Sequence, residues 1–368
     1  MKYILLFILP IVSFAQEITP TVRIHEPMEF SDDLDFSLLD KAIDRQLENY
    51  ERRSLKGTIR FGTLTYPKSI LKDSLIALKK LNGEARECFK SSAKDVCYAE
   101  FSKAVNSTFN IYKPTSATGK TQFTSYYTPD FRGSRVQTAE YKNPIYALPA
   151  NDSDRKLSRV EIDLDGRLQG KGWEFLWVKE TLFDIYFMHI QGGGRVVLPD
   201  GSTTYLSYTG ANGQKFQFVS QYLINSGLME REKTNYFTQR AFLEANPQHQ
   251  RATYATAPFF IYFKETSEEP HGLDDISLTE GRSLAWDNTI YKSLGVINFI
   301  QTVKTTHEDE NGKPVKAPFS RFFLAQDTGS AIRGSARCDL YWGYGEEALF
   351  VAGKLMEMGQ QFFLIKKP

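Results

Sequence analysis

Two aspartates near the C-terminus, Asp327 and Asp339, are the residues of this chain that could do chemistry. Both lie in apolar, strand-like segments of AQDTGSAIRGSARCDLYWGYG (residues 325–345), joined by a connection that contains glycine and serine. An aspartate is disfavoured in a strand and costly to bury without a partner, so each needs an explanation. Asp327 could cap its own turn, DTGS, through an Asx-type hydrogen bond.

Asp339 is the stronger candidate for a catalytic acid. Its neighbours in ARCDLYWG (residues 336–343) are mostly apolar or aromatic. Desolvation by such neighbours raises the pKa of a carboxyl group, and a carboxyl that is protonated near neutral pH can act as a general acid. Structural aspartates in ion pairs are also common, so the residues alone leave both roles open.

Other patterns that carry chemistry are weaker. HIQGGG (residues 189–194) ends in three glycines, but neither a Walker pattern nor Gly-x-Gly-x-x-Gly opening a helix is present. We expect the glycines to follow a strand, IYFMHIQ (residues 185–191), and to let the backbone approach another segment or a ligand closely. No Gly-x-Ser-x-Gly elbow occurs, and no cysteine and histidine spacing suggests zinc. We therefore expect no metal and no cofactor.

The composition favours a polar, uncharged partner. The formal net charge of +1 over 368 residues gives no electrostatic case for nucleic-acid binding. Aromatic residues make up 14% of the chain, and their amphipathic rings suit surfaces that hold polar organic ligands, although composition alone favours an aromatic-rich β core. The length favours two domains over one.

The N-terminus, MKYILLFILPIVSFAQ (residues 1–16), has a lysine, an apolar run and small residues at Ser13 and Ala15. This pattern is typical of a secretory signal peptide, here residues 1–15. No cysteine follows it, so we expect no lipid anchor, and no later run reaches the roughly 18 apolar residues of a spanning helix. We expect an exported protein, soluble in the periplasm or secreted.

The three cysteines leave one question open. In an oxidising compartment Cys88 and Cys97 could form a disulfide across a short helical loop, but two free buried thiols fit the spacing equally well. Cys338, beside Asp339, is expected to be a small buried apolar residue.

Periodicity predicts two amphipathic helices near the N-terminus, over residues 36–55 and 69–83, the second ending at Asn82-Gly83. From about residue 122 the patterns become β-rich. Further expected elements are a strand at 203–210, a helix at 236–247, a strand at 257–265, a hairpin tip at 307–314, and a final strand, helix and strand at 336–342, 346–358 and 361–365.

Several long segments, in order, resemble the membrane-bound lytic murein transglycosylase A family. Residues 325–348 resemble its C-terminal signature, and GRSLAWDNTIYKSLG (residues 281–295) resembles the segment before it, so that Asp287, Asp327 and Asp339 fall on the positions of its three-aspartate domain. Further similarity lies in residues 123–149, 184–202 and 208–216.

The resemblance implies a mainly β fold with flanking helices. A double-psi β-barrel domain, with the N-terminal helices, would comprise residues 16–135 plus 268–368. A second, β-rich domain would be inserted at residues 136–267, with a groove for a glycan strand between the two.

The resemblance also implies cleavage of the bond between N-acetylmuramic acid and N-acetylglucosamine in peptidoglycan without water, which leaves a 1,6-anhydromuramoyl end. Asp339 would be the catalytic acid, and Asp327 and Asp287 would support it. The sugar's own C6 hydroxyl replaces the second carboxylate that ordinary glycosidases need. The partner would be peptidoglycan glycan strands, and the best candidates for contacts in the groove are Thr124, Tyr126, Tyr127, Gln191, Gly192, Gly193 and Gly194.

Two alternatives stay open. An inverting hydrolase would use Asp339 as acid and Asp327 or Asp287 to activate water, with the carboxyl groups roughly 6.5–9.5 Å apart. A wall-binding module of the same barrel type would hold glycan without cutting it, and no acid would face its groove.

Overall fold

The structure is a computed structural model that describes residues 20–310, 312–329 and 331–368. The predicted signal peptide, residues 1–15, lies outside the described residues. Within the described part of the chain, no helix combines the length and the apolar character needed to cross a membrane.

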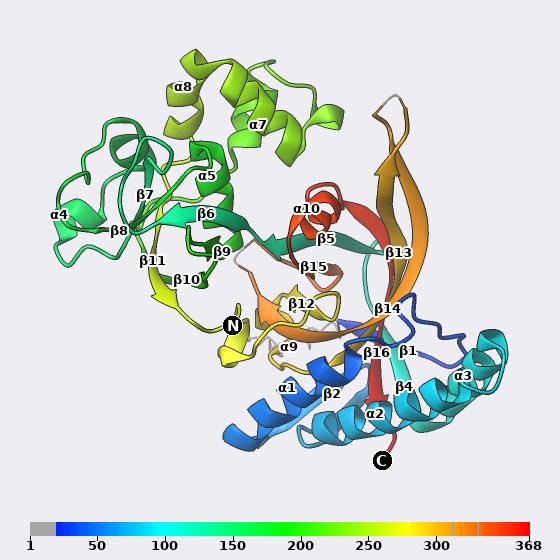
Figure 1. Cartoon of the computed structure of the whole chain (residues 1–368). Coiled ribbons are helices and arrows are strands. Elements are labelled where there is room, and N and C mark those ends of the chain that lie inside the picture. The colour runs from blue at the N-terminus through cyan, green and yellow to red at the C-terminus, as the bar shows by residue number, and fades with distance from the viewer. Residues whose placement is uncertain (1–19, 311, 330) are drawn as a thin grey trace, which may run out of the picture.

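Six strands close into a barrel (Figure 1). Around it the order is β16, β13, β14, β12, β15, β5 and again β16. The pairs β12 with β14 and β15 with β5 are parallel, and the other four pairs are antiparallel. The barrel strands are β5 (Thr121–Thr128), β12 (Ser283–Trp286), β13 (Ile297–Glu308), β14 (Pro314–Thr328), β15 (Arg337–Tyr344) and β16 (Glu357–Lys366). The expected mainly β fold with a barrel and flanking helices is confirmed.

Alternation along the strands separates the barrel core from its outer surface. On β15, Cys338 and Leu340 are fully buried in the core, as expected for Cys338. Because successive side chains of a strand point to opposite faces, Arg337, Asp339 and Tyr341 share the other face. The predicted hairpin between β13 and β14 is also confirmed.

Three long helices pack beside the end of the barrel at which β4 lies (Figure 1). They are α1 (Leu39–Arg52), α2 (Ile70–Cys88) and α3 (Lys94–Thr108). The first predicted helix is confirmed, but the predicted end of the second at Asn82-Gly83 is wrong. Asn82 is fully buried and donates a hydrogen bond to Asp40 of α1, 2.7 Å away. This tertiary contact outweighs the cost of about 1 kcal/mol for glycine inside a helix.

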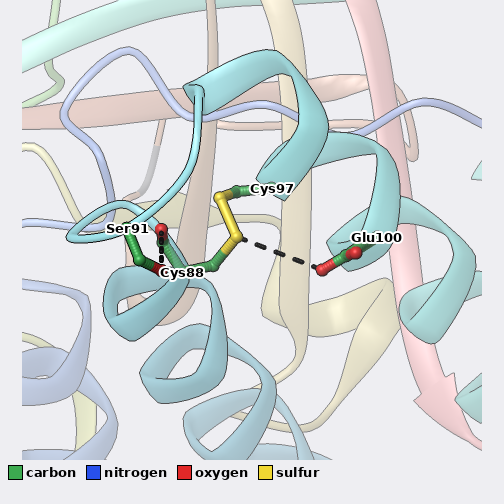
Figure 2. Close-up of a disulfide and its surroundings, with 4 residues drawn as sticks. All are labelled: Cys88, Ser91, Cys97 and Glu100. Carbon is green, nitrogen blue, oxygen red and sulfur yellow. Dashed lines mark hydrogen bonds between the residues drawn. A yellow bond between two sulfur atoms is a disulfide. The ribbon is translucent and has the colours of Figure 1, made fainter.

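A disulfide joins Cys88, the last residue of α2, to Cys97 of α3 (Figure 2). The two Cα atoms are 5.7 Å apart. Of the two states that the spacing allowed, the structure has the bonded one. Cys338 is a free, buried thiol.

A second sheet of six strands lies beside the barrel, in the order β11, β10, β9, β6, β8, β7. Figure 1 shows β5 leading out of the barrel toward β6 in this second unit. Its strands are β6 (Asp130–Ser134), β7 (Asn143–Tyr146), β8 (Glu174–Val178), β9 (Gly193–Val197), β10 (Thr203–Ala211) and β11 (Ile261–Thr266). The predicted strands at 203–210 and 257–265 correspond to β10 and β11. The exact domain boundaries, at residues 136 and 267, stay a prediction.

The remaining elements are short. The helices are α4 (Asp152–Arg155), α5 (Leu182–Gln191), α6 (Val219–Asn225), α7 (Tyr236–Ala245), α8 (Gln250–Ala255), α9 (Asn288–Tyr291) and α10 (Glu346–Ala352). Strands β1 (Thr21–Ile24) and β4 (Phe109–Pro114) extend the barrel sheet beyond β16, and β2 (Thr58–Phe61) pairs with β3 (Leu64–Pro67). A π-helical turn spans Val160–Leu164, and 3-10 turns span Arg231–Lys233, Pro247–His249 and Leu273–Asp275.

One predicted strand, IYFMHIQ, is wrong, because residues 185–191 belong to helix α5. Thr181 and Asp184 form a reciprocal capping box at its start, and Gly192 ends it in the left-handed conformation with φ of +82°. These two end signals outweigh the β propensity of the residues between them. Helix α7 is as predicted, and α10 ends at Ala352, before the predicted residue 358.

A buried ion pair fixes the start of β12. Both oxygens of Asp32 accept from the guanidinium of Arg282, at 2.6 and 2.8 Å, and neither side chain is exposed. Asp32 also accepts from the backbone amide of Phe322 on β14, and Arg282 donates to the carbonyl of Ser37 before α1. The pair therefore joins the segment before α1, strand β14 and the residue directly before β12.

We predict that Arg282→Met lowers the free energy of unfolding by about 3–5 kcal/mol, because it leaves the Asp32 carboxylate buried without its charge partner. Urea unfolding followed by circular dichroism measures this. Lys80→Met, which removes an exposed pair with Glu84 on α2, is the control and should cost less than about 1 kcal/mol. Equal, small losses for both variants would contradict this view of the pair.

Candidate active site

Strand β12 lies between the two aspartates that the sequence singled out. Ala285 of β12 is the register partner of Asp339 on β15 and also of Asp327 on β14. Asp339 in turn pairs with Thr124 on β5. Cross-strand partners share one face of a sheet, and neighbouring strands are about 4.8 Å apart, so the Cα atoms of the two aspartates are about 10 Å apart on one outer face of the barrel.

Asp339 has both of its hydrogen-bond donors on one oxygen. Its Oδ1 accepts from Oγ1 of Thr124 and from Nη1 of Arg337, the latter at 2.5 Å. The side chain is 22% exposed. Burial raises the pKa of Asp339, and the charge and hydrogen bond of Arg337 oppose that rise without cancelling it. The pKa of Asp339 therefore lies above that of an ordinary aspartate.

Asp327 is held differently. Its Oδ1 accepts from the backbone amide of Thr328 at 2.8 Å, and its Oδ2 accepts from the hydroxyl of Tyr126 at 2.9 Å. Burial raises the pKa of Asp327 to about 6, while these hydrogen bonds lower it and the nearby charge of Asp339 raises it. The local bond to Thr328 is the kind of turn contact that the sequence suggested, but the bond to Tyr126 comes from another strand.

Asp287 is the N-cap of α9. Its Oδ1 accepts from the backbone amide of Thr289 at 3.1 Å and from the Thr289 hydroxyl, and its Oδ2 accepts from the amide of Gly334 at 2.9 Å. Although burial raises the pKa of Asp287, these hydrogen bonds outweigh burial and lower it. Asp287 thus anchors the connection between β14 and β15. It is not among the residues that line the cleft described next, and its role in the reaction stays a prediction.

A cleft lies between the barrel and the second sheet, and both contribute to its walls. Of the predicted site residues, those that line it are Tyr126, Tyr127, Gln191, Gly192, Gly193, Gly194 and Asp327. Thr124 and Asp339 are not in this lining but lie on the same barrel face as Tyr126 and Asp327. A wall-binding module was expected to have no acid facing its groove. Asp327 faces the cleft, so this condition is not met.

The glycine run packs closely against other segments, which is one of the two explanations that the sequence left open, and the approach of a ligand stays a prediction. A Cβ atom on Gly193 would lie 2.5 Å from the carbonyl oxygen of Leu206, and one on Gly194 would lie 2.9 Å from the sulfur of Met188. Packing against the backbone therefore requires glycine at position 193, whereas at position 194 a larger residue would have to displace the side chain of Met188. The same residues line the cleft, where Gln191 accepts a hydrogen bond from the backbone amide of Tyr127 at 3.2 Å.

Sequence reasoning missed several residues of this site. Arg337 and Tyr341 could have been found, because both are two residues from Asp339 and so share its face of β15. The hydroxyl of Tyr341 lies 2.8 Å from that of Thr128, and its ring centroid is 5.1 Å from that of Tyr126. The other missed residues come from β10, from β11 and from the segment that follows β11, and only the folding of the chain brings them to the cleft: Tyr205, Leu206, Ser207, Lys264, Thr266, Glu268, Glu269, Pro270, His271, Asp275 and Leu278.

Comparisons with known proteins agree with this architecture. Residues 122–264 match the MltA specific insert domain, and residues 282–365 match the 3D domain. The chain is 30% identical over 253 residues to the membrane-bound lytic murein transglycosylase A of Escherichia coli strain K12, which covers 68% of this chain and 67% of that protein.

Two solved structures have the same fold. One is the membrane-bound lytic murein transglycosylase of Agrobacterium tumefaciens, with a TM-score of 0.67, 25% identity, and coverage of 90% of this chain and 93% of that one. The other is Escherichia coli MltA with bound chitohexaose, with a TM-score of 0.74, 23% identity, and coverage of 95% of each chain.

The closed barrel, the second sheet and the cleft between them therefore define a lytic transglycosylase of peptidoglycan. The chain belongs to the membrane-bound lytic murein transglycosylase A family.

We predict opposite shifts in the pKa of Asp327 from two substitutions. Tyr126→Phe removes a hydrogen bond to the carboxylate, so the pKa should rise above about 6. Asp339→Asn removes the neighbouring carboxyl group whose ionised form raises this pKa, so the pKa should fall. Titration of the carboxyl carbons by NMR, with Asp327→Asn to assign the signal, measures both. Shifts of the same sign would contradict the contacts described here.

Proposed function

We propose that Asp339 is the single general acid and base of the transglycosylase reaction, and that the C6 hydroxyl of N-acetylmuramic acid is the nucleophile. The observation that carries this proposal is the asymmetry of the Asp339 carboxyl group. Two donors hold Oδ1, whereas no described residue donates to Oδ2. A carboxyl with one free oxygen and a raised pKa has the form that a proton donor needs.

The proposed steps balance without water. Oδ2 of protonated Asp339 gives its proton to the glycosidic oxygen, and the bond from C1 of the muramic acid to that oxygen breaks with both electrons on the oxygen. The C6 hydroxyl attacks the positively charged C1 from within the same sugar and gives its proton to Oδ2. The products are a chain ending in N-acetylglucosamine and a 1,6-anhydromuramoyl end, and Asp339 regains its starting form. The intramolecular attack needs no second carboxylate as nucleophile.

Asp327 supports the reaction electrostatically. With a pKa of about 6 it is mostly ionised above neutral pH, and it faces the cleft. A fixed negative charge beside the reacting sugar stabilises the positive charge that develops at C1. The hydroxyl of Tyr126 keeps this carboxylate in place. Asp287 acts from a distance, by holding the connection between the two aspartate-bearing strands.

The cleft holds the glycan strand. Support comes from the related Escherichia coli enzyme, whose structure contains chitohexaose, and from the residues that line the cleft here. Tyr126 and Tyr127 offer aromatic rings to sugar faces, and the backbone of Gly192, Gly193 and Gly194 allows close approach. Thr124 contributes by fixing Asp339.

The enzyme is exported and acts in the oxidising compartment where peptidoglycan lies. The disulfide between Cys88 and Cys97 supports this, because disulfides form and persist in oxidising compartments. The signal-like pattern over residues 1–15 supports it as well.

We predict that Asp339→Asn lowers the rate of release of soluble muropeptides from purified peptidoglycan by about 100-fold or more, because amide groups cannot donate and then accept the proton. Mass analysis of the products should find anhydromuramoyl ends from the wild type. Asp44→Asn, the same substitution at an exposed ion pair on α1, should keep full activity.

Release by Asp339→Asn at the wild-type rate would rule out the assignment of Asp339. Reducing-end muramic acid from the wild type would indicate the inverting hydrolase instead.

A further inference from the structure

Arg337 is tethered both to Asp339 and to its own strand. Its Nη1 donates to Oδ1 of Asp339 at 2.5 Å and to the backbone carbonyl of Cys338 at 2.9 Å. The side chain is only 19% exposed, so the guanidinium lies mostly out of solvent. A two-point attachment of a planar group fixes its direction better than a single contact does.

The contacts of Arg337 and Thr124 make the two oxygens of Asp339 inequivalent. Both donors point at Oδ1, so a proton on Oδ1 would face two other donors, whereas a proton on Oδ2 would not. The carboxyl group therefore carries its proton on Oδ2. In the proposed reaction Oδ2 is the atom that gives and later takes a proton.

The surroundings of Asp339 contain few charges. From β14 comes the carboxylate of Asp327, from β5 the hydroxyl of Tyr126, and from β15 the thiol of Cys338, while β12 contributes the uncharged Ala285. Among the described residues that interact with Asp339 in this structure, Arg337 is the cation.

We propose that Arg337 is a positioning residue that selects Oδ2 as the proton-carrying oxygen of Asp339 and stabilises the carboxylate that remains after the first proton transfer. This inference rests on the proposed function of Asp339 as acid and base. The side chain of Arg337 would both set which oxygen of Asp339 carries the proton and stabilise the Asp339 carboxylate that acts as the base in the second step.

Replacement of Arg337 should move the pH profile of kcat/KM in a defined direction. Arg337 opposes the rise in the pKa of Asp339 that burial causes, so removing the guanidinium raises that pKa further. Because Asp339 must be protonated in the first step, the alkaline limb of kcat/KM reports its loss of the proton. Without Arg337, this limb should therefore move to higher pH, while kcat falls because the acid is less well oriented and its carboxylate less stable.

The test is the pH profile of peptidoglycan cleavage by Arg337→Met, Arg337→Lys and the wild type. For Arg337→Met we expect the alkaline limb to move up by about one pH unit and kcat to fall by about 10- to 100-fold, with little change in KM. Arg337→Lys keeps the charge and should return the limb close to its wild-type position. Arg251→Met, at an exposed ion pair with Asp165, is the matched control and should leave the profile unchanged.

A fall in kcat with an unmoved alkaline limb would overturn the inference, because it would show a purely structural role. If Arg337→Met does not fold, Arg337→Gln, which keeps a donor but not the charge, must show the same upward shift, and an unmoved limb in that variant overturns the inference equally. The activity of Asp339→Asn distinguishes a failure of the proposed function from a failure of the inference about Arg337. If Asp339→Asn is active, the proposed function fails. If that variant is inactive and the limb does not move, the role of Arg337 alone fails.

Discussion

The buried pair between Asp32 and Arg282 is the constraint on which the site depends. Arg282 directly precedes β12, and Ala285 of that short strand separates Asp327 from Asp339. The strand has only four residues, from Ser283 to Trp286, so its own ladder gives little resistance to a shift. A one-residue slip would turn Ala285 to the other face and break the row of partners that aligns the two aspartates. The ion pair, with its further bonds to backbone, holds the register.

The three aspartates differ in the hydrogen bonds that they receive. Asp287 receives three hydrogen bonds and is stabilised as a carboxylate that anchors a turn. Asp327 receives donors on both oxygens, which holds it in place beside the cleft. Asp339 receives donors on one oxygen and keeps the other free. Three identical side chains thus differ in the number and position of their donors, and this difference supports the separate roles that we propose for them.

Sequence reasoning recovered the elements with strong local signals. Helices α1 and α7, the hairpin of β13 and β14 and the final strand, helix and strand all follow from periodicity and turn residues. It failed where a distant contact or an end signal decided the outcome: the contact of Asn82 with Asp40 extends α2, and the capping box of Thr181 makes a helix of an apparent strand. In the site, residues on the strand of Asp339 could be inferred by alternation. Lys264, which reaches the cleft only through the pairing of β10 with β11, could not.

In the proposed reaction no water molecule attacks the sugar. Digestion of peptidoglycan in water enriched in ¹⁸O, followed by mass analysis of the new ends, measures whether water takes part. We expect anhydromuramoyl ends without any ¹⁸O, because the new bond to C1 comes from the sugar's own C6 oxygen. An ¹⁸O atom at C1 of the new muramic acid ends would show that water attacks, and would rule this mechanism out.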